Sequence, residues 1–197
     1  MAGRITGEAL LVGAEALRDG VSTKEIDRRI RAYIEKCGAR PSFLGYGGFP
    51  ASACISVNDT VIHGIPGTRV IREGDIVSVD LGAKFGGYHG DNAATFACGS
   101  IDPEAQRLLD VTKEALARGI AAAQAGNRIG DVSAAVQAYV EENGFSVIRD
   151  FTGHGIGREM HEDPNVPNYG KAGHGIRLRE GMTIAVEPMI AMGSYKV

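Results

Sequence analysis

Hydrophobic residues recur at helical spacing in two segments, 20–38 and 126–144, which align without gaps at an offset of 106 residues. Both segments begin and end with glycine and share an Ala-Tyr-(Ile/Val)-Glu core. The spacing predicts one amphipathic helix in each segment, ended by the final glycine. Chance resemblance of two amphipathic helices is the alternative, but the shared boundaries and core favour an internal duplication. The apolar positions are Ile26, Ile30, Ile34, Val132, Val136 and Val140.

A second helix is predicted before each repeated segment, and stretches with strand-like alternation follow it. These helices span 4–18 and 103–124, and the glycine pair 86–87 predicts a hairpin between two strands. No linker or low-complexity segment interrupts the chain. The sequence therefore predicts an α+β fold in a single domain, 1–197, made of two similar helix–helix–strand halves. The predicted strands are 52–57, 75–82, 88–98, 147–151 and 182–187.

The composition is that of a globular protein, with 197 residues, 44% of them hydrophobic and 23% charged. A net charge of −3 gives no basic surface for nucleic acid. No apolar stretch approaches the ~20 residues of a membrane span. Cys37, Cys54 and Cys98 are far apart and form no CxxC pair, which argues against a disulfide framework or a zinc ribbon. A reducing, cytoplasmic location is expected.

Two aspartates interrupt the strand patterns that flank the predicted hairpin. Asp80 lies in an alternating run whose other face carries Val77, Val79 and Leu81. A carboxylate within such an apolar strand is costly unless it has a partner. Asp91 follows eleven residues later on the partner strand, so the hairpin can bring the two together. The alternative is that Asp80 makes an internal hydrogen bond and Asp91 caps a turn.

A third carboxylate and two histidines complete a possible ligand set. In the last predicted strand, Glu187 lies on the face away from Met182 and the two apolar residues that alternate after it. Glycines flank His154, which permits close backbone approach, and His161 follows seven residues later. One histidine beside three carboxylates suits a divalent Mn, Fe, Co or Zn ion. Two bridging carboxylates would suit a dinuclear hydrolytic site.

Other catalytic templates fit less well. The chain contains neither a GxSxG nucleophile elbow nor an HExxH zinc helix. Cys54 has no neighbouring base, which favours a strand or pocket residue over a nucleophile. His89 and His174 lie among glycines and are predicted to be loop residues rather than ligands. His63, at the end of an apolar strand before a Gly-Ile-Pro turn, fits a structural or a functional role equally.

Taken together, the motifs resemble type I methionine aminopeptidases of the pita-bread (creatinase/aminopeptidase) metallopeptidase family. The matching segments include FLGYGGFPASACISVNDTVIHGIP, GDIVSVDLG, GYHGDNAATF, GHGIGREMHEDPNVPNYG and GMTIAVEPM. The resemblance implies a pita-bread fold, with two pseudo-symmetric halves around an antiparallel sheet. The related prolidases and aminopeptidases P usually carry leucine where Arg158 stands. The short interval between His161 and Glu187 leaves no room for the helical insertion of type II enzymes.

The resemblance implies removal of the initiator methionine from nascent proteins, through attack by a metal-bound water or hydroxide on the first carbonyl. Two divalent ions, such as Co, Mn, Fe or Zn, would occupy a complete site. Glu187 would also accept the proton of the water, and Asp91 would bridge the ions. The implied metal ligands are Asp80, Asp91, His154 and Glu187.

The resemblance also implies how the substrate is held. His161 and His63 would lie beside the scissile amide, donating hydrogen bonds and orienting the peptide. Phe43 and Gly47 replace residues that are often cysteine and histidine in the family, so the pocket differs in detail. The residues that match the lining of the methionine pocket are Tyr46, Phe49, Cys54 and Met160.

Partners follow from the same resemblance: the N-termini of nascent polypeptides, at the ribosome, without direct nucleic-acid or membrane binding. A monomer in the cytoplasm is expected. Two alternatives stay open at this point. One is another pita-bread peptidase of the prolidase or aminopeptidase P kind, and the other is a pita-bread binding module without catalysis.

One family feature has no counterpart in the chain. The last family ligand is a second glutamate on a C-terminal strand, whereas this sequence ends ten residues after Glu187. The expectation is a domain incomplete at its C-terminus, with an exposed sheet edge. Without that bridging carboxylate, a weak site holding one ion and low or absent activity are expected.

Overall fold

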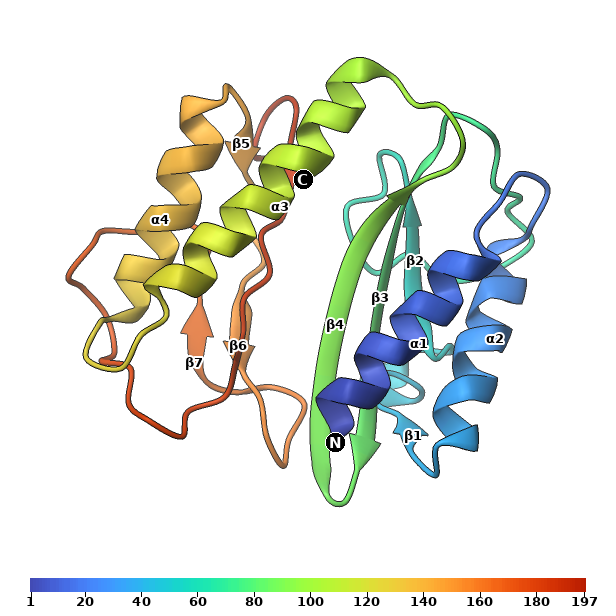
Figure 1. The fold of residues 1–197 in the computed structure, drawn as a ribbon, viewed down its shortest axis with the longest axis horizontal. Helices are drawn as coiled ribbons and strands as arrows, with labels where there is room; N and C mark the ends of the chain where they lie inside the picture. Colours follow the sequence, from blue (N-terminus) through green and yellow to red (C-terminus); the bar gives the residue numbers. More distant parts are fainter. The chain divides into compact units, whose positions relative to one another are not determined.

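A computed structural model describes all residues from 1 to 197, which form two compact units (Figure 1). The first unit comprises Met1–Pro103 and Gly157–Met160. The second comprises Glu104–Ile156 and His161–Val197. Both units combine helices with strands, which agrees with the predicted α+β class. The grouping into one domain stays a prediction. None of the helices is both long and apolar enough to cross a lipid bilayer.

The first unit is built on an antiparallel sheet in which β3 is central (Figure 1). β4 pairs with one edge of β3, and β1 and β2 pair with the other. The predicted hairpin is present, with Gly86 at φ 60° and Gly87 at φ 86°, which a tight primed turn requires. The elements are α1 (Ala2–Ala16), α2 (Thr23–Lys36), β1 (Arg40–Pro41), a 3₁₀ turn (Tyr46–Gly48), β2 (Ala53–Val57), β3 (Ile76–Phe85) and β4 (Tyr88–Ala97).

This sheet has one apolar face and one polar face. Val77, Val79 and Leu81 are fully buried in the core that α1 and α2 share with the sheet. Because strand side chains alternate, the residues between them point to the face away from the helices. Ser78 there hydrogen-bonds Thr95 of β4 over 2.8 Å. The alternation in the sequence therefore places polar side chains on the face of the sheet opposite α1 and α2.

The second unit packs two helices over small sheets. Side chains of α3 and α4 form a core with Phe145 and Val147, and β6 pairs with both β7 and β8. A separate pair joins β5 to β9. The elements are α3 (Pro103–Ala122), α4 (Ile129–Glu142), β5 (Ser146–Val147), β6 (Gly153–Gly155), β7 (Glu162–Val166), β8 (Ile184–Ala185) and β9 (Ile190–Ala191).

The strands of the second unit differ most from the predictions. The predicted strands 147–151 and 182–187 are wrong in length, since each contributes two residues or fewer to a ladder. Met182 is 41% exposed rather than packed with the apolar residues that follow it. β6 and β7 were not predicted, because glycines and prolines hide their alternation. In the first unit, His89 belongs to β4 rather than to a loop, whereas His174 does lie in a loop.

The two repeated segments form α2 and α4, and their starts are tied in the same way. The Gly20 N–H donates to the Ile71 carbonyl, and the Gly126 N–H donates to the Leu178 carbonyl, both over 3.0 Å. A second hydrogen bond runs in the opposite direction in each case. The Ile71 N–H donates to the Val21 carbonyl, and the Leu178 N–H donates to the Asn127 carbonyl, both over 2.8 Å. The duplication stays a prediction, and these matching pairs of hydrogen bonds favour it.

Candidate metal centre and substrate pocket

Asp80 and Asp91 lie on the polar face of the first unit's sheet. In the antiparallel register Asp80 pairs with Ala93, and Asp91 pairs with Gly82. The two aspartates are therefore diagonal neighbours on one face, a placement that leaves their carboxylates within reach of a shared ion. Both are half-buried. The polar face thus offers two carboxylates side by side, as a ligand pair for a hard cation requires.

Cys54 occupies the same face, on β2. It is 4% exposed and pairs directly with Asp80. Burial raises the pKa of the Cys54 thiol to about 12, and the charges of Asp80 and Asp91 act in the same direction. The His63 backbone, which hydrogen-bonds the thiol, opposes that shift. A thiol with so high a pKa is protonated at neutral pH, so Cys54 lacks the thiolate that a nucleophile needs.

The segment that contains His63 is fixed against β2. The Ile55 N–H donates to the Gly64 carbonyl over 2.8 Å, and the Gly64 N–H donates to Ser56 Oγ over 3.0 Å. A Cβ at Gly64 would lie 2.3 Å from the Ile55 carbonyl oxygen, so only glycine fits. His63 itself adopts a left-handed conformation with φ 58°, uncommon for a residue with a side chain. This anchored turn holds the exposed His63 close to the end of β2.

The predicted pocket residues are only partly gathered. Met160 is buried and packs with Phe43 against Gly82, where an added Cβ would lie 3.0 Å from each side chain. Gly82 is the register partner of Asp91, so these side chains reach the polar face beside the aspartates. Phe49 is half-buried, and Tyr46 is exposed in the 3₁₀ turn.

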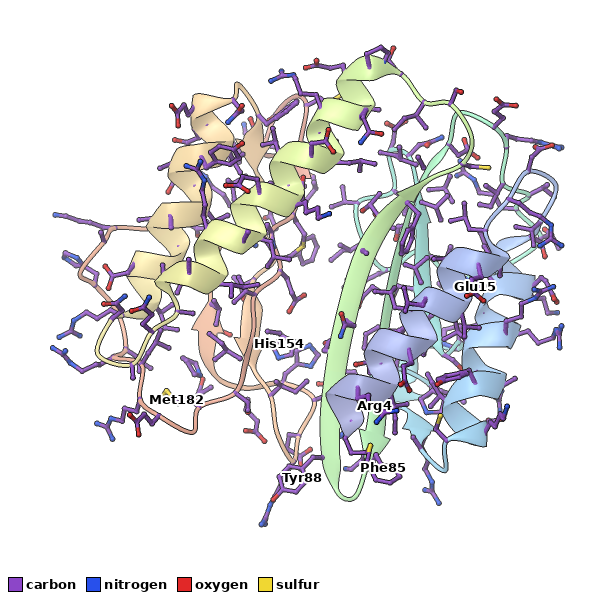
Figure 2. All side chains as sticks on the ribbon, in the orientation of Figure 1. Arg4, Glu15, Phe85, Tyr88, His154 and Met182 are labelled. Atoms are coloured by element: carbon purple, nitrogen blue, oxygen red, sulfur yellow. The ribbon has the colours of Figure 1, made fainter.

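The second unit brings together His154 and Glu187. His154 extends from β6 (Figure 2), and its Nδ1–H donates to the Gly155 carbonyl over 2.7 Å. That bond leaves the lone pair of neutral imidazole on Nε2, which lies 3.2 Å from Glu187 Oε1. Glu187 Oε1 is buried and accepts no hydrogen bond. A lone pair facing a buried carboxylate oxygen is the arrangement that a divalent cation would stabilise, so these residues fit a metal.

His161 is exposed beside this pair. Its ring centroid lies 4.2 Å from that of His154, with the two planes tilted by 49°. It directly precedes β7, which begins at Glu162, and its side chain is exposed to solvent next to His154. This position suits a residue that contacts a substrate near the metal.

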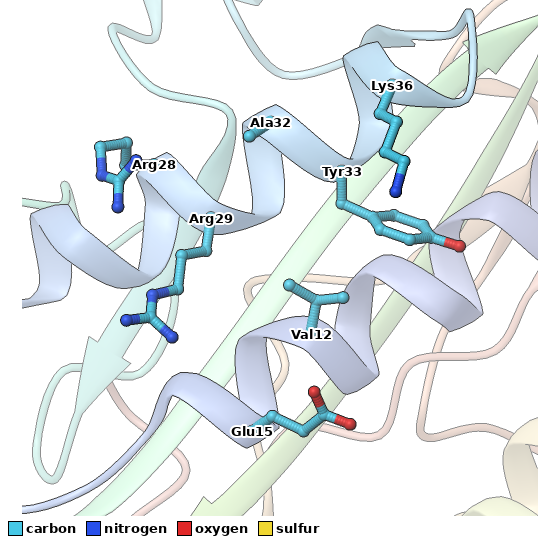
Figure 3. Close-up of a pocket in the computed structure, with 7 residues that line it drawn as sticks. All are labelled: Val12, Glu15, Arg28, Arg29, Ala32, Tyr33 and Lys36. Carbon is cyan, nitrogen blue, oxygen red and sulfur yellow. The ribbon is translucent and has the colours of Figure 1, made fainter.

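A separate groove lies between α1 and α2, outside the predicted site (Figure 3). It encloses about 300 Å³, and none of the predicted site residues line it. Two of its cations, Arg28 and Arg29, are paired with Glu25 over 2.7 and 2.9 Å. The groove is therefore a charged surface groove between α1 and α2. Its lining residues are Val12, Glu15, Arg28, Arg29, Ala32, Tyr33 and Lys36.

Two supporting residues were not recognised from the sequence. Asp27 accepts hydrogen bonds from the backbone N–H groups of Ser52 and Ala53 over 2.8 and 2.9 Å, and so fixes the start of β2. Asn168 donates its side-chain N–H to the Glu187 carbonyl over 2.6 Å. The sequence does contain a sign of the role of Asp27, because this carboxylate lies next to an apolar position of a helical pattern. Asn168 gave none beyond its place between two prolines and a tyrosine.

Residues 1–196 match metallopeptidase family M24. That match spans nearly the whole chain and every candidate ligand. The chain therefore belongs to this family of metallopeptidases, and it is a hydrolase that depends on divalent metal.

Within the family, the chain is similar to methionine aminopeptidases. It is 53% identical over 196 residues to that of Clostridium perfringens, covering 100% of this chain and 79% of the relative. The Bacillus subtilis enzyme methionine aminopeptidase 1 is 49% identical over 181 residues, covering 92% of this chain and 73% of the relative. The crystal structure of the Thermotoga maritima methionine aminopeptidase is 44% identical with a TM-score of 0.97, covering 98% of this chain and 78% of that one.

Prolidases share the fold but are more distant. The Pyrococcus furiosus prolidase is 26% identical with a TM-score of 0.83, covering 95% of this chain and 50% of that one. The fold is thus the pita-bread fold of these peptidases. The higher identity and coverage favour the methionine aminopeptidase interpretation over the prolidase alternative.

Proposed function

We propose that this peptidase removes the N-terminal methionine of nascent polypeptides. The observation that carries the proposal is the pair of His154 Nε2 and the buried Glu187 Oε1, 3.2 Å apart without a hydrogen bond to the carboxylate oxygen. The aspartate pair on the polar face of the first unit's sheet supplies the remaining carboxylates. The proposed ligands are Asp80, Asp91, His154 and Glu187.

Bound divalent ions supply Lewis acidity, which polarises the substrate carbonyl and makes water a stronger nucleophile. The protein side chains perform the other tasks. Glu187 accepts a proton from the attacking water, because its carboxylate lies 3.2 Å from the proposed ligand His154. His161 donates a hydrogen bond to the oxygen that gains charge. His63, held in its strained turn, orients the peptide.

Selection of methionine is assigned to the apolar side chains next to the aspartates. An unbranched thioether fits a pocket formed by apolar and sulfur-containing groups. Met160, packed at Gly82, and Cys54, opposite Asp80, form its floor. Phe49 and Tyr46 contribute its more exposed wall. The proposed pocket thus uses residues of the first unit that surround the aspartate pair.

The setting of the activity belongs to the same proposal. The substrates would be polypeptide N-termini emerging at the ribosome, and the enzyme would act in the cytoplasm as a monomer. Manganese, iron, cobalt and zinc all suit a ligand set of one imidazole and three carboxylates. Metal analysis of the purified chain counts the ions that this set holds.

The direct test compares two peptides, Met-Gly-X and an X-Pro dipeptide, with Glu187→Gln as the inactive control. Any turnover should be of Met-Gly-X, with release of free methionine at the low rate expected of this ligand set, and it should be lost in the control. Preference for the X-Pro peptide would replace the proposal with a prolidase. Metal binding without cleavage of either peptide would favour a binding module instead.

A further inference from the structure

Asn168 is 1% exposed, and its side chain makes one identified hydrogen bond, to the backbone of Glu187. The amide nitrogen donates to the Glu187 carbonyl over 2.6 Å. Because a carbonyl can only accept, this bond fixes which way the amide faces. The other end of the amide, Oδ1, is buried and accepts no hydrogen bond. The buried amide therefore serves Glu187 and leaves its own oxygen unsatisfied.

The backbone around Glu187 needs such a donor. β8 ends at Ala185, where the ladder pairs it with His154. Pro188 follows Glu187 and has no N–H to donate. The next backbone tie is from the Ile148 N–H to the Met189 carbonyl over 2.9 Å. Between the backbone pairing at Ala185 and the hydrogen bond at Met189, the Asn168 amide binds the carbonyl of Glu187.

The segment that carries Asn168 is itself held by α4. Ser133 Oγ donates to the Pro167 carbonyl over 2.5 Å, and the Gly170 N–H donates to Gln137 Oε1 over 2.9 Å. Ser133 and Gln137 lie one turn apart on that helix. Residues 167–170 are thus fixed at both ends to a regular element, and Asn168 lies between those two points.

We propose that Asn168 is a positioning residue that sets the orientation of the Glu187 carboxylate relative to His154 Nε2. The chain of contacts runs from α4 through residues 167–170 to the Glu187 carbonyl, all within the second unit. This inference rests on the proposed role of Glu187 as a metal ligand. Groups that orient metal ligands typically change metal affinity by about 10- to 100-fold when removed.

The decisive variant is Asn168→Leu, because leucine keeps the branched shape of asparagine without donor or acceptor. The matched control is Asn143→Ala, which removes another side-chain amide bond to a carbonyl, from Asn143 to Tyr139 over 2.8 Å, at the end of α4. The probe is Co²⁺ alone, titrated into the metal-free 197-residue chain by calorimetry and by its visible absorption. The melting temperature of the metal-free chain is measured in parallel.

We expect Asn168→Leu to weaken Co²⁺ binding by about 10- to 100-fold and to change the visible spectrum. The metal-free melting temperature should change little, since the lost donor to the Glu187 carbonyl and the removal of the unsatisfied Oδ1 have opposite effects on stability. Asn143→Ala should lower the melting temperature and leave Co²⁺ affinity unchanged. Equal Co²⁺ affinity in Asn168→Leu and the wild type would overturn the proposal. If the leucine variant does not fold, Asn168→Ala is read by the same criteria.

A double variant separates this inference from the function on which it rests. If Asn168 acts through Glu187, adding Asn168→Leu to Glu187→Gln should cause little further loss of Co²⁺ affinity. Fully additive losses would show that Asn168 acts elsewhere and would overturn the positioning role. If Glu187→Gln alone leaves Co²⁺ affinity unchanged, the ligand assignment itself is wrong, and the inference fails with it.

Discussion

Cys54 and Asp80 lie directly opposite one another in the antiparallel pairing of β2 with β3. The polar face of the sheet therefore places a thiol and a proposed metal ligand in one row, with Asp91 diagonal to Asp80 on β4. A carboxylate so placed raises the pKa of the thiol, adding to the larger effect of burial. The same row combines a reactive residue type with surroundings that suppress its reactivity.

Because the Cys54 thiol is protonated at neutral pH, the turnover of Cys54→Ser should stay within about tenfold of the wild-type value. Removal of a true nucleophile lowers turnover by roughly 10⁴-fold or more. Iodoacetamide at pH 7.5 should modify the half-buried Cys37 before Cys54, whose pKa of about 12 keeps it protonated. Peptide mapping by mass spectrometry gives the order of modification. Cys54 labelled first, together with loss of turnover, would restore the nucleophile hypothesis.

His161→Ala should reduce turnover by about 10²- to 10³-fold, the usual effect of removing a hydrogen-bond donor to a developing oxyanion. The metal content should stay at the wild-type level, because His161 is exposed beside His154 rather than assigned as a ligand. Asp91→Ala is the contrasting variant and should lose metal. Elemental analysis of both proteins checks the division of roles, which is wrong if their metal contents fall equally.

Gly82→Ala should disturb the pocket more than the metal centre. The added Cβ would lie 2.8 Å from Ser42 Cβ and 3.0 Å from both Met160 Cε and Phe43 Cε1. We expect a higher KM for Met-Gly-X with near-normal metal content, and a stability loss of about 1–3 kcal/mol from overpacking. Gly3→Ala is the control, since nothing lies within 4 Å of its added Cβ. Unchanged KM in Gly82→Ala would remove Met160 from the pocket.

Asp27 predicts a pH dependence of stability. Burial raises the pKa of this carboxyl above its ordinary value, even though the backbone N–H groups of Ser52 and Ala53 act against the shift. A group whose pKa is higher in the folded chain stabilises it fully below the unfolded pKa, and that contribution is lost as pH rises through the folded pKa. Wild-type Asp27 therefore carries a penalty at neutral pH that is absent in acid.

The melting temperature of Asp27→Asn, compared with that of the wild type, should accordingly be higher at pH 7 than at pH 3. The variant keeps both hydrogen bonds, since its amide oxygen can still accept them. Asp27→Ala should lose roughly 1–3 kcal/mol at pH 7, because it leaves both N–H groups without their acceptor. Melting temperatures of the three proteins at both pH values test this. A difference between Asn and Asp that does not change with pH would contradict the raised pKa.

Prediction from sequence worked best where one pattern repeats over many residues. The alternation around Asp80 runs through a ten-residue strand, and it correctly placed Val77, Val79 and Leu81 in the core. At Glu187 the pattern was too short, since β8 has two residues and its pairing with β6 decides the conformation. The contact of Asn168 with Glu187 joins residues 19 positions apart without any periodic signal.

The hydrogen bonds at the starts of α2 and α4 also bear on how the chain folds. Each ties a glycine to a carbonyl about fifty residues further along, so a long loop must close before the tie can form, at an entropic cost that grows slowly with loop length. The helices themselves form from neighbouring residues, on a much faster timescale. Their first turns should therefore gain protection from hydrogen exchange later than their last turns, and at the same stage in both repeats.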